Sequence, residues 1–349
     1  MVTRMRIGVV GPGLIWKHAH RPAIEKLGDA VDVVAFCASS EKTRQEVAHE
    51  YPDKPFFFDY HELVQQPDLD AVLILTPIAL NAPVALAALR ANKSVLLEKP
   101  MARTLSEAEE LVDEARNRDL NLWILEQDGY RATWQQVRTL LDAGEIGRAV
   151  SFERVWHRFF LPETSGDGSA GTEWRQQPDF ILGTLYDGGH HAIAALSTLF
   201  GPPRSVYATS VSLRPGYGES DHETMILDYD QGPRGYFSHA TYLSGARNYF
   251  IIRGTDGLLD VGREQLIVAH NDGTQRVIPL ERSGAHDTMW RALLQAYRDG
   301  AQPAYTPECG LRELAILHGI YTSIQQEKRI DIPYPAGIAM GSGGATSCV

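Results

Sequence analysis

The feature that most constrains this chain is an alternation of short apolar runs and helical patterns over its first 150 residues. The apolar runs are continuous, which is typical of strands buried on both faces of a sheet. We predict strands at residues 5–10, 31–38, 56–58, 71–75, 94–97 and 122–125. We predict helices from the first glycine turn to residue 27 and at 41–51, 60–66, 80–92, 106–119 and 133–143. This order indicates an α/β fold with a doubly wound parallel sheet, the Rossmann architecture. A capping box of Ser106 and Glu109 is predicted to open the fifth helix.

The pattern changes after Gly144-Glu145-Ile146-Gly147. Strands are predicted at 149–157, 206–213, 223–229, 235–242, 249–254 and 265–269, and helices at 187–200, 287–299 and 307–327. Short alternating segments of this kind favour an open, mostly antiparallel sheet in an α+β domain. With 349 residues, two domains are expected: a Rossmann domain at 1–126 and an α+β domain at 127–335. The last helix of the chain is allowed to return to the first domain, and 336–349 is predicted to be a frayed tail.

Composition excludes several classes of protein. The net charge of −11 argues against a nucleic-acid partner. Three cysteines, Cys37, Cys309 and Cys348, exclude a disulfide scaffold and a zinc site built from cysteine alone, and they suit a reducing compartment. The longest uncharged run, 71–89, is broken by prolines and is interpreted as strand, turn and helix rather than a membrane span. Because no signal or transit segment is convincing, we expect a cytoplasmic protein without a membrane partner.

A glycine turn follows the first predicted strand, with the sequence Gly11-Pro12-Gly13-Leu14-Ile15-Trp16. Gly11 permits a tight turn, and Gly13 lets the backbone N–H groups at Leu14 and Ile15 approach a pyrophosphate at the helix N-terminus. The third position, usually glycine or alanine, is Trp16. A simple turn is the alternative interpretation, but the position between strand and helix favours dinucleotide binding.

The second strand lacks the acidic residue that normally binds the adenosine ribose of NAD. The sequence there is Cys37-Ala38-Ser39-Ser40. Ser39 and Ser40, with Lys42 and Arg44 nearby, can receive a 2′-phosphate, which favours NADP over NAD. The alternative is that these residues only cap a helix and face solvent.

A lysine stands at the end of the fifth predicted strand, in Glu98-Lys99-Pro100. Ligands of such sheets bind outside the carboxyl ends of the strands. Pro100 ends the strand and restricts Lys99 to an extended backbone. A surface lysine in a turn is the competing interpretation.

Several segments together resemble one family over about residues 5–335. They are Gly11-Pro12-Gly13, Thr76-Pro77, Glu98-Lys99-Pro100, Gly144-Glu145-Ile146-Gly147, Trp174-Arg175, the run Gly183-Thr184-Leu185-Tyr186-Asp187-Gly188-Gly189-His190-His191, and Thr306-Pro307-Glu308. The chain resembles the Gfo/Idh/MocA family of nicotinamide-dependent sugar and polyol oxidoreductases. The resemblance implies that 1–126 is an NAD(P)-binding Rossmann domain and that 127–335 is an α+β domain for substrate binding and oligomerisation, whose open sheet forms a homodimer or homotetramer. It also implies a cis Lys99–Pro100 peptide and chemistry carried by Lys99, His191 and Asp187. Besides Trp16 and the missing ribose acid, two positions depart from the family pattern: Asn81 stands where histidine is frequent, and Ala194 where aspartate is frequent.

These residue types suit oxidation of a secondary alcohol. Histidine as a residue type titrates near neutral pH, so His191 can take the hydroxyl proton. Asp187, four residues earlier, shares a helical face with it and can orient the imidazole or bind a second hydroxyl, although an N-cap role is the alternative. Lys99 can stabilise developing charge on the oxygen. His190 must point elsewhere, and Gly188 with Gly189 leaves room for a sugar ring.

Further residues complete the predicted site. Those expected to bind the cofactor are Gly11, Gly13, Leu14, Ile15, Ser39, Ser40, Lys42, Thr76, Pro77, Asn81, Glu98, Lys99 and Gln127. Those expected to bind substrate are Lys99, Trp156, Arg158, Trp174, Asp187 and His191. A structural role is the simpler explanation for Glu126, Gln127, Trp156, His157, Arg158, Tyr242 and His286. His18 and His20 lack a carboxylate or cysteine at metal-ligand spacing, so no metal is expected.

The sequence therefore predicts an NAD(P)-dependent dehydrogenase or reductase that acts on a secondary hydroxyl or carbonyl of a sugar, polyol or related small molecule. Two alternatives remain open. One is an NAD-dependent glycoside hydrolase of the same fold. The other is a non-catalytic sensor of dinucleotide or sugar, which would be expected to lose Lys99 or His191.

Overall fold

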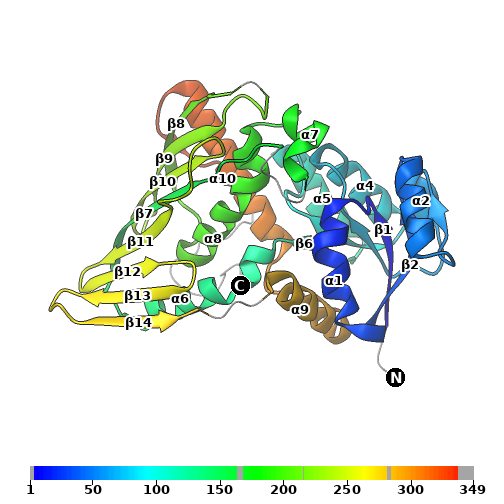
Figure 1. Cartoon of the computed structure of the whole chain (residues 1–349), viewed down its shortest axis with the longest axis horizontal. Helices are drawn as coiled ribbons and strands as arrows, with labels where there is room; N and C mark the ends of the chain where they lie inside the picture. The colour runs from blue at the N-terminus through cyan, green and yellow to red at the C-terminus, as the bar shows by residue number, and fades with distance from the viewer. Residues whose placement is uncertain (1–3, 163–167, 215, 281–283, 337–349) are drawn as a thin grey trace. The chain divides into compact units, whose positions relative to one another are not determined.

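The computed structural model of the chain describes residues 4–162, 168–214, 216–280 and 284–336 (Figure 1). Contacts divide the chain into two compact units. The first comprises Met1–Gln127 and Ala285–Leu311, and the second Asp128–Gly284 and Arg312–Val349. Residues 285–311 therefore belong with the first unit, whereas the predicted division assigned all of 127–335 to the second domain. Most of the predicted tail, 337–349, lies outside the described residues.

The first unit contains a six-stranded parallel sheet. Its strands are β1 (Met5–Val10), β2 (Val31–Cys37), β3 (Phe56–Phe57), β4 (Ala71–Ile74), β5 (Ser94–Glu98) and β6 (Leu122–Leu125). Their order is β3-β2-β1-β4-β5-β6, and every pair is parallel. Every residue of β4 and β6 is buried, as expected for a sheet covered on both faces. The strand order reverses between β1 and β4, which is the point where such sheets bind ligands. The predicted Rossmann architecture is confirmed.

Helices of the first unit follow the predicted pattern with small shifts. They are a π-helical turn Trp16–His20 that leads into α1 (Arg21–Glu25), then α2 (Glu41–Glu50), α3 (Tyr60–Val64), α4 (Ile78–Arg90), α5 (Leu105–Asn117) and α9 (Ala285–Asp299). The predicted capping box at Ser106 and Glu109 is wrong. The box consists of Thr104 and Glu107, whose side chains each accept a hydrogen bond from the other's backbone N–H. The same Ser/Thr-x-x-Glu pattern occurs twice, two residues apart, and the helix begins at the first.

Helix α9 explains why residues 285–311 belong with the first unit. It is strongly amphipathic, and Met289, Trp290 and Leu293 are fully buried. It packs beside α1 (Figure 1), and the Trp290 indole N–H donates a hydrogen bond to His20. The apolar face of an amphipathic helix must be buried, and the first unit buries the apolar face of α9.

The second unit contains a nine-stranded sheet in the order β14-β13-β12-β11-β7-β10-β9-β8-β15. The strands are β7 (Ala149–His157), β8 (Ser205–Val211), β9 (His222–Asp228), β10 (Arg234–Ala240), β11 (Tyr249–Gly254), β12 (Gly257–Val261), β13 (Gln265–His270), β14 (Gln275–Pro279) and β15 (Ile330–Asp331). Among these described strands only β7 and β10 pair in parallel. The predicted mostly antiparallel sheet is confirmed, with β12, β14 and β15 as additional strands.

Helices cover one face of this sheet (Figure 1). They are α6 (Ala132–Asp142), α8 (His190–Phe200) and α10 (Pro307–Gln326), and a short α7 (Glu173–Gln176) lies in a connection. Phe152, Phe237 and Ile252 point to the covered face and are buried. On the other face, Tyr207, Ile226 and Tyr249 remain exposed. Within the described part of the chain, no helix combines the length and apolar character needed to cross a membrane.

Candidate active site

The turn after β1 has the geometry of a phosphate-binding loop. Gly11 has a φ of +81°, and a Cβ there would lie 2.8 Å from the backbone oxygen of Leu75, so only glycine fits. A Cβ on Gly13, by contrast, would meet nothing closer than the Gly11 oxygen at 3.9 Å. Gly13 is exposed and is followed directly by the helical residues Leu14 and Ile15. The protein itself therefore does not require glycine at position 13, whereas a ligand approaching the helix N-terminus would.

Trp16 explains how this loop departs from the usual fingerprint. Its indole is buried, and its ring meets that of Phe36 on β2 edge-on with centroids 5.8 Å apart. The third glycine of the fingerprint normally serves close packing of helix on strand. Here a large aromatic residue fills that space, and the helical segment continues as a π-helical turn from Trp16.

The end of β2 presents few groups for a ribose phosphate. Ser40 is the N-cap of α2 and accepts a hydrogen bond from the Thr43 N–H at 3.4 Å. Arg44 is paired with Glu41, with N–O distances of 2.6–2.9 Å. Ser39 and Lys42 are exposed. The capping interpretation therefore holds for Ser40, while Ser39 and Lys42 remain available to a ligand at the surface.

The ends of β4 and β5 are joined through Asn81 on α4. The Asn81 amide donates to the backbone oxygen of Glu98 at 3.1 Å and to that of Pro100 at 2.8 Å. Its side-chain oxygen accepts a hydrogen bond from the Thr76 hydroxyl at 2.8 Å. Asn81 is only 1% exposed. The polar groups of Asn81, which stays a predicted cofactor residue, thus bond to Thr76 and to the segment around Lys99. The Lys99–Pro100 peptide is cis, as the resemblance implied.

Glu98 is a buried carboxylate held by His20. The His20 Nε2 lies 2.8 Å from Glu98 Oε1, and the Trp290 indole N–H donates to His20 Nδ1 at 3.1 Å. Because an indole nitrogen can only donate, Nδ1 must carry a lone pair, and Nε2 then carries the proton that goes to Glu98. Burial alone would raise the pKa of Glu98, but the hydrogen bond from His20 and the positive charge of Lys99 hold it below its usual value.

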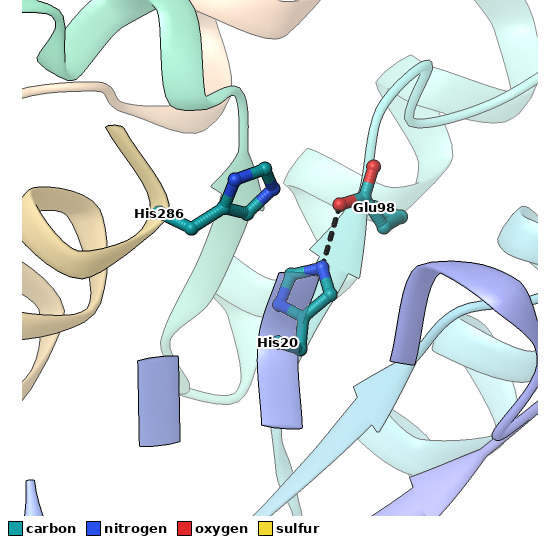
Figure 2. Close-up of side chains that lie close together, drawn as sticks. All are labelled: His20, Glu98 and His286. Carbon is teal, nitrogen blue, oxygen red and sulfur yellow. Dashed lines mark hydrogen bonds and ion pairs between the residues drawn. The ribbon is translucent and has the colours of Figure 1, made fainter. Parts of the chain in front are cut away.

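Figure 2 shows His286 of α9 beside this pair. The ligand atoms of His20, Glu98 and His286 lie within 4.8 Å of one another, a grouping that sequence spacing did not reveal. Two imidazoles and a carboxylate are a common metal-binding set. A metal on His20 Nε2 would require a proton on Nδ1, which normally donates to a second-shell acceptor. Trp290 places a donor there instead, so the arrangement fits a hydrogen-bonded neutral histidine better than a metal centre.

In the second unit, Asp187 lies in a π-helical turn, Leu185–Gly189, that leads into α8. Its carboxylate pairs with the Arg175 guanidinium at 2.7 Å, and that guanidinium stacks over the Trp174 ring at 4.0 Å. The alternative N-cap role for Asp187 is excluded, because Thr184 and Gly189 occupy the cap positions. Sequence analysis did not place Arg175 in the site. Its position directly after Trp174 in a matching segment was the available signal.

The two adjacent histidines have different environments. His190 is buried, and its Nε2 lies 2.8 Å from Glu313 of α10. His191 is half-buried. This agrees with the expectation that only one of them can face a ligand, and it leaves His191 as the accessible imidazole.

The two glycines before these histidines serve different purposes. A Cβ on Gly188 would meet nothing within 4 Å, so open space lies there. A Cβ on Gly189 would lie 2.5 Å from Leu185 and 3.2 Å from the His239 ring. His239 is fixed from the other side, since its Nδ1 lies 2.8 Å from buried Glu223. Only Gly188 therefore fits the predicted room for a sugar ring, whereas Gly189 is needed for packing.

The remaining candidates lie at element ends. Trp156 is half-buried near the end of β7, with its ring centroid 5.8 Å from that of His239. Arg158 is exposed, with its guanidinium 4.3 Å from the centre of the Phe160 ring. Glu126 is buried and Gln127 half-buried just after β6. Lys99 lies in the first unit, and His191, Asp187, Trp156 and Trp174 lie in the second.

Comparison with known proteins decides the family. The model of an oxidoreductase family with an NAD-binding Rossmann fold, Gfo/Idh/MocA, matches residues 5–125, and the model of a C-terminal domain of the same family matches 134–260. The chain belongs to the Gfo/Idh/MocA family. It is an oxidoreductase of the dehydrogenase and reductase type.

Individual Gfo/Idh/MocA proteins resemble the chain over most of its length. The scyllo-inositol 2-dehydrogenase (NADP(+)) IolW of Bacillus subtilis is 24% identical, over 94% of this chain and 96% of its own. The uncharacterized oxidoreductase YdgJ of Escherichia coli is 31% identical over 74% and 71%. The crystal structure of an oxidoreductase from Thermotoga maritima superposes with a TM-score of 0.86 at 23% identity, covering 94% of this chain and 98% of that one. The likeness to the Thermotoga maritima structure shows a shared fold alone.

Proposed function

We propose that this oxidoreductase transfers hydride between a nicotinamide cofactor and a secondary hydroxyl or carbonyl group of a sugar, polyol or related small molecule. The observation that carries the proposal is Lys99, which follows β5 at the carboxyl edge of the Rossmann sheet, where substrates of such sheets bind. The name of the Bacillus subtilis relative, an inositol dehydrogenase, supports a polyol-like substrate.

The cofactor-binding part of the proposal rests on the loop after β1. Gly11, Gly13, Leu14 and Ile15 would hold the pyrophosphate, and Gly13 has open space where a side chain would otherwise project. Thr76 and Pro77 follow the neighbouring strand β4, on the other side of the switch point. When bound, the nicotinamide would accept or supply the hydride.

We assign the acid–base roles to residues of both units. For oxidation, the His191 imidazole takes the hydroxyl proton, because neutral histidine is a competent base near pH 7. The Lys99 ammonium stabilises the negative charge that develops on the same oxygen. Asp187, held by Arg175, accepts a hydrogen bond from a further hydroxyl of the substrate. Trp156, Arg158 and Trp174 are proposed to line the substrate site, and Gln127 to contact the nicotinamide end.

We propose NADP as the preferred cofactor. Ala38 stands where an acid would bind the ribose of NAD, and Ser39 and Lys42 are exposed beside it. The chain's Bacillus subtilis relative is named for NADP(+). We expect Lys42→Glu to weaken NADP binding by about tenfold while leaving NAD binding within about twofold, because only NADP carries the 2′-phosphate. Titration of intrinsic fluorescence with each reduced cofactor measures both constants. Tighter binding of NAD by the wild-type chain would reject the assignment.

We also propose a cytoplasmic homo-oligomer, a dimer or tetramer, associated through the open face of the nine-stranded sheet. Exposed Tyr207, Ile226 and Tyr249 on that face support it. The low cysteine count supports a reducing compartment.

A substrate screen tests the reaction. Inositols, sugars and diols are incubated with NAD⁺ or NADP⁺, and reduced nicotinamide is followed by absorbance at equilibrium and over time. We expect turnover with at least one polyol or sugar, and Lys99→Met to lower kcat by about a hundredfold to a thousandfold, because charge stabilisation at the oxygen is lost. Cofactor affinity should change little.

Two results would contradict the proposed reaction. One is unchanged turnover in Lys99→Met. The other is cleavage of a glycoside without net production of reduced nicotinamide, which would instead support a hydrolase of this fold.

A further inference from the structure

The backbone on both sides of Lys99 is held by side chains that come from elsewhere in the first unit. Asn81 of α4 donates to the carbonyl oxygens of Glu98 and Pro100, the residues that flank Lys99. Both bonds come from one amide nitrogen, at 3.1 and 2.8 Å. Thr76 fixes the orientation of that amide, because its hydroxyl donates to the Asn81 oxygen.

The side chain that precedes Lys99 is held as well. His20 Nε2 donates to the Glu98 carboxylate at 2.8 Å, and both groups are buried. Trp290 of α9 determines which nitrogen of His20 can donate, since its own N–H occupies Nδ1. Trp290 thus acts on Glu98 through His20, and the three residues come from segments far apart in sequence. Figure 2 shows the bond between His20 and Glu98.

We propose that Asn81 and His20 are positioning residues that fix the backbone from which Lys99 reaches its substrate. This inference rests on the proposed function, in which Lys99 acts on the substrate oxygen. A lysine ammonium lies at the end of four rotatable bonds, so its placement depends on an immobile Cα. A displacement of about 1 Å at a reacting centre can cost about a hundredfold in rate.

A purely structural role predicts a different distribution of bonds. Buried polar groups anywhere in a fold need partners, and any carbonyl would satisfy Asn81. Here Asn81 bonds to the two backbone oxygens on either side of one lysine. The carboxylate of Glu98 is bonded to His20, whose tautomer is fixed by the Trp290 N–H. The bonds surround the proposed catalytic residue and do not involve it directly.

The first test compares Asn81→Ala with Ser323→Ala in the second unit. Ser323 is also fully buried and also bridges main-chain groups, accepting from the Ala208 N–H and donating to the Lys328 oxygen. With the fastest substrate of the polyol and sugar screen, Asn81→Ala should lower kcat about tenfold to a hundredfold with KM and cofactor affinity within about threefold. Ser323→Ala should lower thermal stability and leave kcat within about twofold. Equal kcat values in the two variants would overturn the proposal.

A second test separates hydrogen bonding from packing at His20. Glutamine can place an amide N–H where His20 Nε2 donates, whereas leucine fills the space without a donor. We expect His20→Gln to retain at least a third of the wild-type kcat and His20→Leu to lose at least nine-tenths of it. Similar kcat values for the two variants would show that His20 acts only through its volume.

Failure of this inference is distinguishable from failure of the proposed function. If Lys99→Met keeps full turnover, the proposed function fails. If Lys99→Met is impaired and Asn81→Ala is not, only the positioning role fails. A crystal structure of Asn81→Ala needs no substrate: displacement or multiple positions of Lys99 supports the proposal, and an unchanged Lys99 overturns it.

Discussion

At the scale of single residues, the orientation of several histidines is set by the partners of their ring nitrogens. His20 is fixed by a donor on one nitrogen and a carboxylate at the other. His239 is fixed by Glu223, and His190 lies against Glu313. The local sequence gives no sign of these pairings, because the partners are tens to hundreds of residues away. Of the adjacent pair His190 and His191, the half-buried His191 is the more accessible.

His157 provides a pH-dependent prediction. Its Nε2 is hydrogen-bonded to Ser238 at 2.9 Å, and burial, together with the nearby His222 and His239, lowers its pKa in the folded chain. The unfolded chain therefore binds a proton more readily than the folded one as the pH falls. Stability contributed by neutral His157 is present above its unfolded pKa of about 6.5 and is lost as the pH falls through the lower folded value.

We accordingly expect His157→Gln, which keeps a donor for Ser238, to reduce the loss of stability between pH 7 and pH 5. Urea unfolding at several pH values measures the slope. An identical slope in wild type and variant would show that His157 does not contribute.

At the scale of elements, how well a strand could be predicted from the sequence depended on how deeply that strand is buried. The parallel strands were found nearly to the residue because each is a continuous apolar run, and buried β4 and β5 show the clearest signal. Strand β14 was missed because four of its five residues are exposed and no alternation marks it. It is an edge strand ordered by pairing with β13. Short β15 likewise depends on its partner β8.

The candidate site was predictable where one segment carries it. Gly11, Gly13 and Lys99 could be assigned from their places relative to strands. The contacts that hold the residues on either side of Lys99 could not, because His20, Asn81 and Trp290 belong to separate helices, and no periodicity relates them. The region Asp187–His191 was assigned a regular helical spacing, but its first part is a π-helical turn, so the four-residue spacing does not carry its usual geometry.

The turn after β1 offers a matched pair of substitutions. Gly11→Ala should destabilise the chain by about 1–3 kcal/mol, because of its positive φ and the close Leu75 oxygen. Gly13→Ala should change stability by less than about 0.5 kcal/mol and weaken cofactor binding about tenfold or more, because its methyl group would enter the space proposed for the pyrophosphate. Urea unfolding and fluorescence titration provide the two measurements. Normal cofactor affinity in Gly13→Ala would contradict the proposed binding mode.

At the scale of the whole molecule, the open face of the second sheet is the surface that we propose for association. Apolar side chains from β8, β9 and β11 lie exposed on it. We expect Ile226→Lys to shift the proposed oligomer toward monomers, because a charge would have to be desolvated in the proposed interface. Light scattering after size-exclusion chromatography measures the mass.

Phe58→Lys is the matched control for that experiment. Phe58 is also an exposed apolar residue, but it lies in the first unit after β3. Its substitution should leave the mass unchanged. A shift in Phe58→Lys and none in Ile226→Lys would place the interface elsewhere.

The first unit is built from two stretches of chain, and α9 belongs to the second of them. During translation, Trp290 is made only after all strands of the second sheet except β15 have been synthesised. The nascent first unit therefore lacks α9, and His20 lacks its indole partner, until about four-fifths of the protein has left the ribosome. A fragment ending at residue 127 would lack α9 and so leave uncovered the α1 surface that α9 contacts.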